Sequence, residues 1–294
     1  MREINFCSAA SFLAISIMFS LFGFSANTYA KDPVIIVLSY NIRLATPSDA
    51  PNTWNARKQK VFSIIRESKA DVFGLQEALH EQVIDIKNAF PDFTKVGVGR
   101  DDGIEAGEYS PLFFNAHKYK MLSSGTFWLS QTPSLPGSRG WDAACNRVVS
   151  WVKLKDYKTG KIFLVFSTHF DHMGEMARRN SAKLLIHAVD SLSGNYPAVV
   201  LGDFNSQPGS EPYKIITDQS DPKHLSDARE NCKKPAGPKH TFTGFKVGGQ
   251  PGERIDYIFL KNKVKVQSFR VNNANNGDYY PSDHLPVSAT LELD

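Results

Sequence analysis

The sequence predicts an α/β fold in which two mixed β-sheets pack face to face and helices cover their outer surfaces. Short apolar runs rich in β-branched residues alternate with amphipathic helical patterns in both halves of the chain. Between these halves, consecutive strand patterns separated by turn signals predict hairpins. Two face-to-face sheets fit this order of elements, although periodicity alone leaves other α/β folds open.

Two buried strands, each followed by a helix, are predicted in the first part of the chain. The run Val-Ile-Ile-Val-Leu-Ser-Tyr at residues 34–40 is typical of a strand buried on both faces. Apolar residues at helical spacing predict a helix over residues 55–69. A short apolar strand is predicted over residues 71–76, and an amphipathic helix over residues 80–90 ends at Pro91.

The middle of the chain is richer in strand patterns. Strands are predicted over residues 110–115, 120–128, 147–155 and 161–168. The turn Lys158-Thr-Gly-Lys161 joins the last two into a hairpin. A long helix is predicted over residues 173–192, with a stop at Gly194. Four further strands are predicted over residues 197–201, 254–260, 265–271 and 285–293.

The first thirty residues have the pattern of a secretory signal peptide. Arg2 precedes an apolar run over residues 12–24, and small and polar residues then lead to Ala30. The apolar run is interrupted by polar residues and is shorter than the roughly 20 residues that a membrane span needs. We therefore expect residues 1–30 to be removed, leaving a secreted or periplasmic protein with no transmembrane span in the mature chain. A retained N-terminal anchor is the alternative.

Residues 31–294 are expected to form one domain, because no linker, repeat or low-complexity tract divides them. The chain has a formal net charge of +4. This balance suits a polyanionic substrate without requiring one, and no block of like charges resembles a nucleic-acid-binding arm. The cysteines outside the first thirty residues are Cys145 and Cys232, and the sequence leaves open whether they form a disulfide. It also leaves the oligomeric state open.

Polar side chains follow the predicted apolar strands at several points along the sequence. In layered α/β proteins the strand ends form a rim on which ligands bind. Asparagine, glutamate, histidine and aspartate at these ends would therefore bring oxygen and imidazole groups into one cleft. Taken singly, each has an ordinary explanation as a turn residue or a helix cap, so the prediction depends on their shared position. The residues are Asn41, Glu77, His169, Asp203, Asn205, Asp256, Asp283 and His284.

Six short motifs, in this order, resemble those of the endonuclease/exonuclease/phosphatase superfamily. They are Ser39-Tyr-Asn-Ile-Arg43, Gly74-Leu-Gln-Glu77, Ser167-Thr-His169, Gly202-Asp-Phe-Asn205, Arg254-Ile-Asp-Tyr-Ile-Phe259 and Ser282-Asp-His284. The resemblance covers essentially the whole chain from Val34 to Leu293. It implies a four-layer α/β sandwich and the hydrolysis of a phosphate ester with a divalent metal, usually Mg²⁺, with Mn²⁺ as the other candidate.

The resemblance also implies roles for the cluster residues. Glu77 matches the main metal-binding carboxylate, with Asn41 beside it. Mg²⁺ prefers carboxylate and amide oxygens and keeps several waters, so these two ligands would suffice. Asp203 matches the residue that orients or deprotonates the attacking water, and Asn205 matches its partner on the phosphate.

Two histidines complete the implied site, and each is expected to have a supporting carboxylate. His284 matches the histidine that contacts the scissile phosphate, and Asp283 matches the acid that orients it. His169 matches a second histidine of deoxyribonuclease-like relatives, and Asp256 matches the acid that supports this second histidine. A carboxylate partner would fix the tautomer of each ring and favour its protonated form.

Two further residues are implied to bind substrate. Arg147 opens a predicted strand where deoxyribonuclease-like relatives carry a phosphate-binding arginine, and a guanidinium suits phosphate geometry. Tyr109 lies where related enzymes place a phosphate-contacting tyrosine. Arg43 occupies a position at which some relatives have an acid, so the resemblance does not supply a second metal ligand there.

The substrate is left open, because the loops that would select it match the family least well. The first expectation is a phosphoesterase acting on a phosphodiester or phosphomonoester of unknown identity, resembling uncharacterised secreted bacterial members. A secreted nuclease ranks lower, since no long basic or aromatic insertion is present to enter a nucleic-acid groove. A sphingomyelinase-like enzyme would need an exposed apolar hairpin, which the sequence lacks outside its predicted strands. A catalytically inactive binding module is the alternative of another class, and the intact motifs argue against it.

Overall fold

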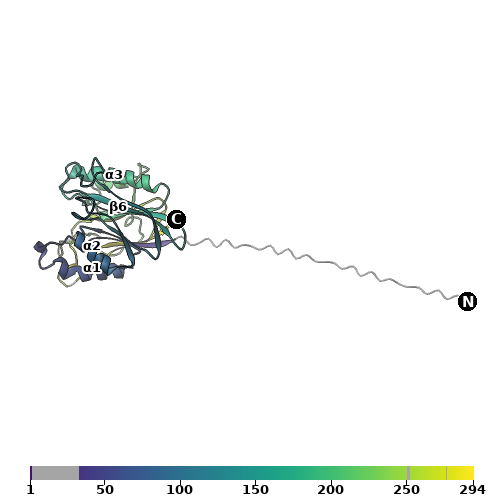
Figure 1. Cartoon of the computed structure of the whole chain (residues 1–294), viewed down its shortest axis with the longest axis horizontal. Helices are drawn as coiled ribbons and strands as arrows, with labels where there is room; N and C mark the ends of the chain where they lie inside the picture. The colour runs from purple at the N-terminus through teal and green to yellow at the C-terminus, as the bar shows by residue number, and fades with distance from the viewer. Residues whose placement is uncertain (2–32, 250–251, 276) are drawn as a thin grey trace. The chain divides into compact units, whose positions relative to one another are not determined.

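The fold is built on a pair of six-stranded mixed β-sheets. The computed structural model describes residue 1 and residues 33–249, 252–275 and 277–294 (Figure 1). The predicted signal peptide, residues 1–30, lies outside these described residues except for Met1. In the described part of the chain, no helix is both long enough and apolar enough to cross a membrane.

The first sheet has the strand order β11-β12-β1-β2-β4-β3. Its central pair, β1 and β2, runs parallel, and the other neighbouring pairs are antiparallel. The strands of this sheet are β1 (Val34–Asn41), β2 (Val72–Gln76), β3 (Phe93–Val96), β4 (Leu112–Asn115), β11 (Val264–Val271) and β12 (Val287–Leu293).

The second sheet repeats this plan with the order β5-β6-β7-β8-β10-β9. Its central pair, β7 and β8, is again parallel, and its other pairs are antiparallel. Each sheet thus has two central parallel strands whose carboxyl ends are free to carry functional side chains. The strands of this sheet are β5 (Tyr119–Trp128), β6 (Val148–Asp156), β7 (Ile162–His169), β8 (Ala198–Asp203), β9 (Ser226–Asp227) and β10 (Asp256–Lys261).

Helices cover the outer face of each sheet, so the described residues from 33 onward form four layers (Figure 1). On the first sheet, α1 and α2 pack over a cluster that contains the stacked rings of Phe73 and Phe113. On the second sheet, Leu185 of α3 and Ile216 of α4 share one apolar cluster with the strands. The layers confirm the predicted sandwich. The helices are α1 (Trp54–Ser68), α2 (His80–Ala89), α3 (Glu175–Ser193), α4 (Glu211–Thr217) and the short 3₁₀ helix η1 (Pro47–Asp49).

The inner faces of the two sheets meet in a continuous apolar core. Val37 and Val72 of the first sheet and Val165 and Val199 of the second lie in this core and are fully buried. The burial of each such side chain contributes about 1.5–3 kcal/mol to the free energy of folding. The central strands are buried on both faces, which is why their sequences are nearly continuous apolar runs.

Most predicted elements are present, and the omissions have physical causes. β3 is an edge strand in which only Val96 is buried, so it has no apolar run to recognise. β9 has two residues, and α4 has seven with Pro212 in its first turn, which gives no helical period. The helix α3 ends at Gly194, as predicted, and this glycine has a positive φ of 53°.

The two cysteines whose state the sequence left open are both free thiols. Cys232 is buried in the core between the sheets, and Cys145 is half-buried and lines the cleft described below. No disulfide therefore joins them.

Candidate active site

Eight predicted site residues converge at one end of the two sheets. Asn41 ends β1, Glu77 follows β2, His169 ends β7 and Asp203 ends β8, so the parallel pairs deliver their carboxyl ends to one place. β10 runs antiparallel to β8 and begins there, with Asp256 opposite Asp203 in the register. The others are Asn205, just after β8, and Asp283 and His284, just before β12.

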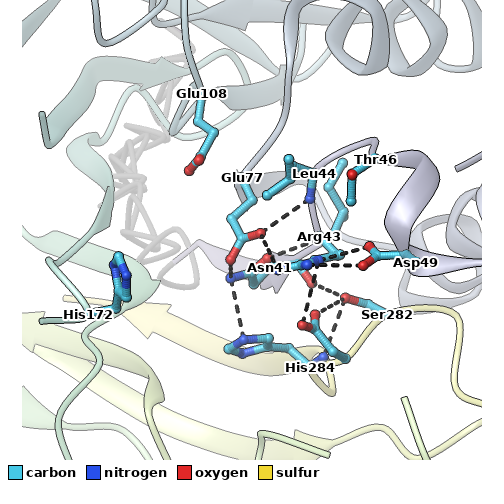
Figure 2. Close-up of polar contacts among 12 residues, drawn as sticks. Asn41, Arg43, Leu44, Thr46, Asp49, Glu77, Glu108, His172, Ser282 and His284 are labelled. Carbon is cyan, nitrogen blue, oxygen red and sulfur yellow. Dashed lines mark hydrogen bonds and ion pairs between the residues drawn. The ribbon is translucent and has the colours of Figure 1, made fainter. Parts of the chain in front are cut away.

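Asn41 lies at the centre of the cluster and joins the two sheets. Its side-chain Nδ2 donates to Glu77 Oε1 and to Asp203 Oδ2, each at 3.0 Å. The same nitrogen lies 3.5 Å from His284 Nε2 (Figure 2). Because Asn41 is fully buried, its two hydrogen bonds fix two carboxylates around a single amide, with the His284 ring beside them.

The donor set around Asn41 fits a hard divalent cation. Ligand atoms of Glu77, Asp203 and His169 lie within 4.8 Å of one another. Carboxylate and amide oxygens are the groups that Mg²⁺ and Mn²⁺ prefer. Two carboxylates held by one amide also repel each other, and a cation between them would relieve this repulsion. Of the two residues predicted to bind metal, Glu77 offers a carboxylate to such a cation. The Asn41 amide presents its Nδ2 to the carboxylates, and its Oδ1 accepts from the Arg43 N–H at 3.0 Å.

Arg43, which stands where some relatives have an acid, lies beside Glu77. Its guanidinium donates to both oxygens of Asp49, at 2.9 and 3.0 Å (Figure 2). It also lies 3.8 Å from Glu77 Oε2 and 3.9 Å from Asp283 Oδ2. A fixed positive charge therefore stands beside the Glu77 and Asp283 carboxylates.

Three residues of the site have a left-handed backbone without being glycine. Arg43, Glu77 and Asn205 have φ values of 56°, 60° and 45°. Such conformations cost about 1–3 kcal/mol each and persist where the surrounding structure fixes them. Here they turn the chain sharply after β1, β2 and β8, which directs the side chains into the cluster.

His284 is held by Asp256 and not, as predicted, by Asp283. Its Nδ1 lies 2.9 Å from Asp256 Oδ2, and both residues are buried. The Asp283 carboxylate instead accepts a hydrogen bond from Ser282 Oγ at 3.3 Å. The prediction was wrong because the chain bends at Ser282 and Asp283, which directs the Asp283 carboxylate to Ser282 and toward Arg43 and away from the ring.

The charge of His284 follows from this pairing. Burial disfavours the protonated ring, but the carboxylates of Asp256 and Asp203 outweigh burial and raise the pKa of His284 well above its ordinary value. The ring is therefore an imidazolium at neutral pH. It presents its Nε2–H toward Asn41 and Asp203, where a phosphate oxygen could accept it.

His169 is neutral, unlike His284, and no carboxylate of the described residues lies within hydrogen-bonding distance of its Nδ1. The predicted support by Asp256 is wrong, because that carboxylate is bound to His284. The Nε2 atom of His169 lies 3.0 Å from Asn205 Nδ2 and 3.5 Å from Asp203 Oδ2. Burial, reinforced by nearby arginines, lowers the pKa of His169 well below its ordinary value. A neutral ring that accepts from Asn205 carries its hydrogen on Nδ1, which is buried without a partner among the described residues.

Asp203 has the character of a base that works near neutral pH. Burial and the neighbouring Asp256 carboxylate raise the pKa of Asp203 to about 7. The backbone N–H of Asn205 donates to Asp203 Oδ1 at 2.9 Å, so the carboxyl group is held in one orientation. A catalytic base is most effective when its pKa lies near the working pH.

The cluster forms one wall of a cleft with a volume of about 680 Å³, within the range of small-molecule sites. Arg147, Glu108 and His172 line the cleft as well, and Figure 2 shows Glu108 and His172 standing apart from the cluster around Asn41. Arg147 is buried, with Nε 3.4 Å from Asp171 Oδ2 and Nη2 3.0 Å from His172 Nδ1. Its Nη1 is buried without a partner in the described structure, so one donor is left for a ligand.

Tyr109, a predicted substrate-binding residue, does not line this cleft. Its hydroxyl lies 2.9 Å from His80 Nδ1 and donates to the Ile104 carbonyl at 3.1 Å. The preceding residue, Glu108, enters the cleft instead and accepts from Arg100 at 2.7 Å. Burial raises the pKa of the Glu108 carboxyl.

Sequence reasoning missed Glu108, His172 and Phe242. Glu108 could have been found from the alternation of side chains, because a buried Tyr109 directs its neighbour to the opposite side. Phe242 lies in a loop without a strand pattern, and its ring stands 5.1 Å from the His284 ring at the edge of the cleft. His172 follows β7 by three residues and had no motif to mark it.

Arg57 of α1 joins the two loops that carry the cluster. Its buried guanidinium donates to the carbonyl of Ile42 and to those of Arg43, Leu44 and Pro281 at 2.7, 3.4 and 3.3 Å. Three of these carbonyls follow Asn41, and the fourth precedes Asp283 and His284. One side chain thus fixes the loop after β1 against the loop before β12.

Replacing Arg57 with alanine should therefore lower both stability and activity. Each buried carbonyl left without a donor costs about 1–3 kcal/mol, so thermal unfolding should occur at a clearly lower temperature. Arg57→Lys keeps the charge but cannot span several carbonyls, so it should recover part of the stability and less of the kcat. The control is Arg66→Ala, an exposed arginine of the same helix. Wild-type kcat in folded Arg57→Ala would show that the loops do not need this contact.

Comparison with known proteins gives the site a context. Residues 38–284 match the sequence profile of the Endonuclease/Exonuclease/phosphatase family. A solved structure from Bacteroides vulgatus, described as an endonuclease/exonuclease/phosphatase, is 41% identical, with a TM-score of 0.85 over 89% of this chain and 100% of that one. A mannosyl-6-phosphatase from Bacteroides thetaiotaomicron is 35% identical, with a TM-score of 0.82 over 87% and 99% of the two chains.

A similarity to nocturnin from Drosophila melanogaster is more distant. The two sequences are 23% identical over 283 residues, which is 82% of this chain and 42% of nocturnin. This chain therefore spans less than half the length of that relative.

Proposed function

Since the chain belongs to the endonuclease/exonuclease/phosphatase family, whose members are typically hydrolytic phosphoesterases, we propose that it hydrolyses the phosphate monoester of a sugar with a divalent cation. The observation that carries the proposal is the Asn41 amide, which holds the Glu77 and Asp203 carboxylates beside a protonated His284. This arrangement supports the proposal, because it would provide a cation site, a base and a positively charged phosphate-binding group within one cleft.

Glu77 is the residue that would hold the cation, and the Asn41 amide fixes its carboxylate by a hydrogen bond. Mg²⁺ is the first candidate and Mn²⁺ the second. When bound, the cation supplies positive charge that offsets the negative charge of the phosphate group. The remaining charge falls to this chain's own side chains. His284 donates its Nε2–H to a phosphate oxygen, and the free Nη1 of Arg147 is placed to bind another.

Asp203 takes a proton from the water that attacks phosphorus. A bond forms between the water oxygen and phosphorus, and the ester bond to the sugar oxygen breaks. The sugar oxygen takes up a proton from solvent and leaves as an alcohol, and Asp203 later returns its proton to solvent. The neutral His169 ring and Asn205 lie beside Asp203 and limit the directions from which water can approach. General-base catalysis of this kind contributes roughly 10²–10⁴-fold to the rate.

The substrate class is supported by the relative and by the lining of the cleft. The mannosyl-6-phosphatase resembles this chain over nearly the full length of both, and its name specifies a sugar phosphate. In this chain, Glu108 and Glu253 line the cleft together with Phe242. Carboxylates accept hydrogen bonds from sugar hydroxyls and repel the further phosphates of a polynucleotide. An exposed aromatic ring provides a flat surface for a sugar ring.

Metal removal tests the proposal. Purified protein should release phosphate from mannose 6-phosphate with Mg²⁺ or Mn²⁺, lose this activity in EDTA, and regain it when the metal is restored. Glu77→Gln removes a negative ligand, so the Mg²⁺ concentration for half-maximal activity should rise by about tenfold or more. Glu81→Gln, an exposed glutamate on α2, is the matched control. Undiminished activity in EDTA would rule out the cation.

A further inference from the structure

A second hollow borders the active cleft and has a volume of about 500 Å³. It lies between the first turns of α3 and the segment from Asn205 to Pro212. Asn205 and Glu253 line both this hollow and the active cleft, so the two spaces meet along these residues. Asn205 also contacts His169, which places the boundary directly beside the catalytic cluster.

The lining of the second hollow is polar and has no excess of positive charge. Arg178 and Arg179 face the three carboxylates of Glu175, Glu211 and Glu253, and Arg179 is paired with Glu211 at 3.2 Å. Neutral hydrogen-bonding groups come from Ser206, Gln207 and Ser210. A polyanion would require an excess of cations here, and a lipid chain would require an apolar wall. A neutral ligand with many hydroxyl groups matches this mixture of donors and acceptors.

We propose that the second hollow, termed the outer subsite, binds the sugar units attached to the phosphorylated one, so that the preferred substrate is a phosphorylated oligosaccharide. The inference rests on the proposed function and deepens it. A phosphorylated sugar held in the cleft extends across Asn205 and Glu253 into the outer subsite. Contacts far from phosphorus can lower the barrier of the reaction, since remote binding energy can be used to orient the reacting group.

One residue connects the outer subsite to the active cleft. The Asp171 carboxylate accepts from Arg147 of the cleft at 3.4 Å, and its carbonyl accepts from Arg178 of the outer subsite at 3.1 Å. The carboxylate also accepts from the backbone N–H groups of Met173 and Gly174. Asp171 is 1% exposed, so it holds both arginines from a rigid position.

Gln207 is the best-placed residue for the test. It is exposed, it lines the outer subsite but not the active cleft, and its side chain has no hydrogen-bond partner among the described residues. Arg179 also lines only the outer subsite. Neither residue contacts the catalytic cluster, so their replacement should leave the chemistry of a monosaccharide phosphate unchanged.

The experiment compares kcat/KM for mannose 6-phosphate with that for a mannotriose carrying the same 6-phosphate on one terminal unit. We expect the trisaccharide to be preferred by about tenfold or more. Gln207→Ala combined with Arg179→Ala should reduce kcat/KM for the trisaccharide toward that for mannose 6-phosphate. The kcat/KM for mannose 6-phosphate should stay constant. Lys183→Ala, an exposed cation one turn further along α3 that lines neither space, should change neither value.

Equal kcat/KM values for the two wild-type reactions would overturn the inference, and so would a double variant that lowers both values equally. In either case, Mg²⁺-dependent hydrolysis of mannose 6-phosphate would still support the proposed function. If neither sugar phosphate is hydrolysed while p-nitrophenyl phosphate or an oligonucleotide is, the proposed substrate class and the outer subsite are both wrong.

Discussion

Replacing Asp203 with asparagine should lower kcat by about 10³-fold, because a general base contributes roughly 10²–10⁴-fold and an amide cannot accept the proton. The fold should survive, since the two side chains have nearly the same shape. The variant removes a charge that is costly beside Asp256, but it also loses one of the two oxygens that accept from Asn41 and Asn205. The informative quantity is therefore the pH dependence of its stability relative to the wild type.

The stability difference should depend on pH in a defined direction. The pKa of Asp203 is raised in the folded protein to about 7, above its unfolded value of about 4. The wild type therefore loses stability as pH rises between these two values, whereas the asparagine variant does not. The unfolding temperature of the variant relative to the wild type should therefore be lowest near pH 4 and highest at pH 7 and above.

A matched control is Asp71→Asn. Asp71 is also buried, but it precedes β2 and so lies at the opposite end of the sheet from Glu77. It accepts from the Ile36 N–H at 2.9 Å and is paired with Lys118. This variant should lose stability and keep its kcat. If Asp203→Asn retained more than about a tenth of wild-type kcat at pH 7, Asp203 would not be the base.

Asp256→Asn should lower kcat by about 10²-fold or more and shift its pH dependence, because His284 loses the partner that holds its proton and its orientation. The raised pKa of His284 keeps the ring protonated above neutral pH. Activity that needs the imidazolium is full below this pKa and is lost as pH rises through it. Without the Asp256 charge the pKa falls, so the alkaline loss of activity should begin at a lower pH.

The discriminating control is Asp283→Asn, which changes the acid that the sequence had assigned to His284. Its carboxylate contacts Ser282 and lies near Arg43, not against the ring. In a profile of kcat against pH, the loss of activity at alkaline pH should shift less in Asp283→Asn than in Asp256→Asn. NMR titration of the His284 ring should show directly that its pKa falls more in Asp256→Asn than in Asp283→Asn. A larger fall of the His284 pKa in Asp283→Asn would show that the His284–Asp256 contact does not set the charge of the ring.

The membership of the cluster was predictable because it depends on local sequence. Asn41 and Asp203 are 162 residues apart, yet each directly ends an apolar strand. A polar residue at such a strand end is visible in the sequence, and the layered fold brings these ends together. The same rule identified Glu77 and His169.

The pairing within the cluster was not predictable, because it depends on how separate segments approach each other. Asp256 reaches His284 only because β10 begins where the loop before β12 crosses the end of the second sheet. Sequence adjacency suggested Asp283 instead. Tyr109 was predicted to bind substrate, but Glu108 enters the cleft instead. Neighbouring side chains point to opposite sides, so a shift of one residue along the chain changes which of them faces the cleft.

Loop residues were the hardest to assign. His172 and Phe242 line the cleft from segments with no apolar period, and their position depends on contacts with Arg147 and His284. The outer subsite was hidden for the same reason, since Gln207 belongs to a connection whose course only the folded chain defines.

Hydrolysis of mannose 6-phosphate in ¹⁸O-labelled water with Mg²⁺ tests most directly whether a water activated in this cleft attacks phosphorus. The label should appear in the released phosphate and not in the sugar, and its rate of appearance should fall by about 10³-fold in Asp203→Asn. Label in the sugar hydroxyl, or release that is equally fast in EDTA and in Asp203→Asn, would contradict hydrolysis by this arrangement of Asn41, Glu77 and Asp203.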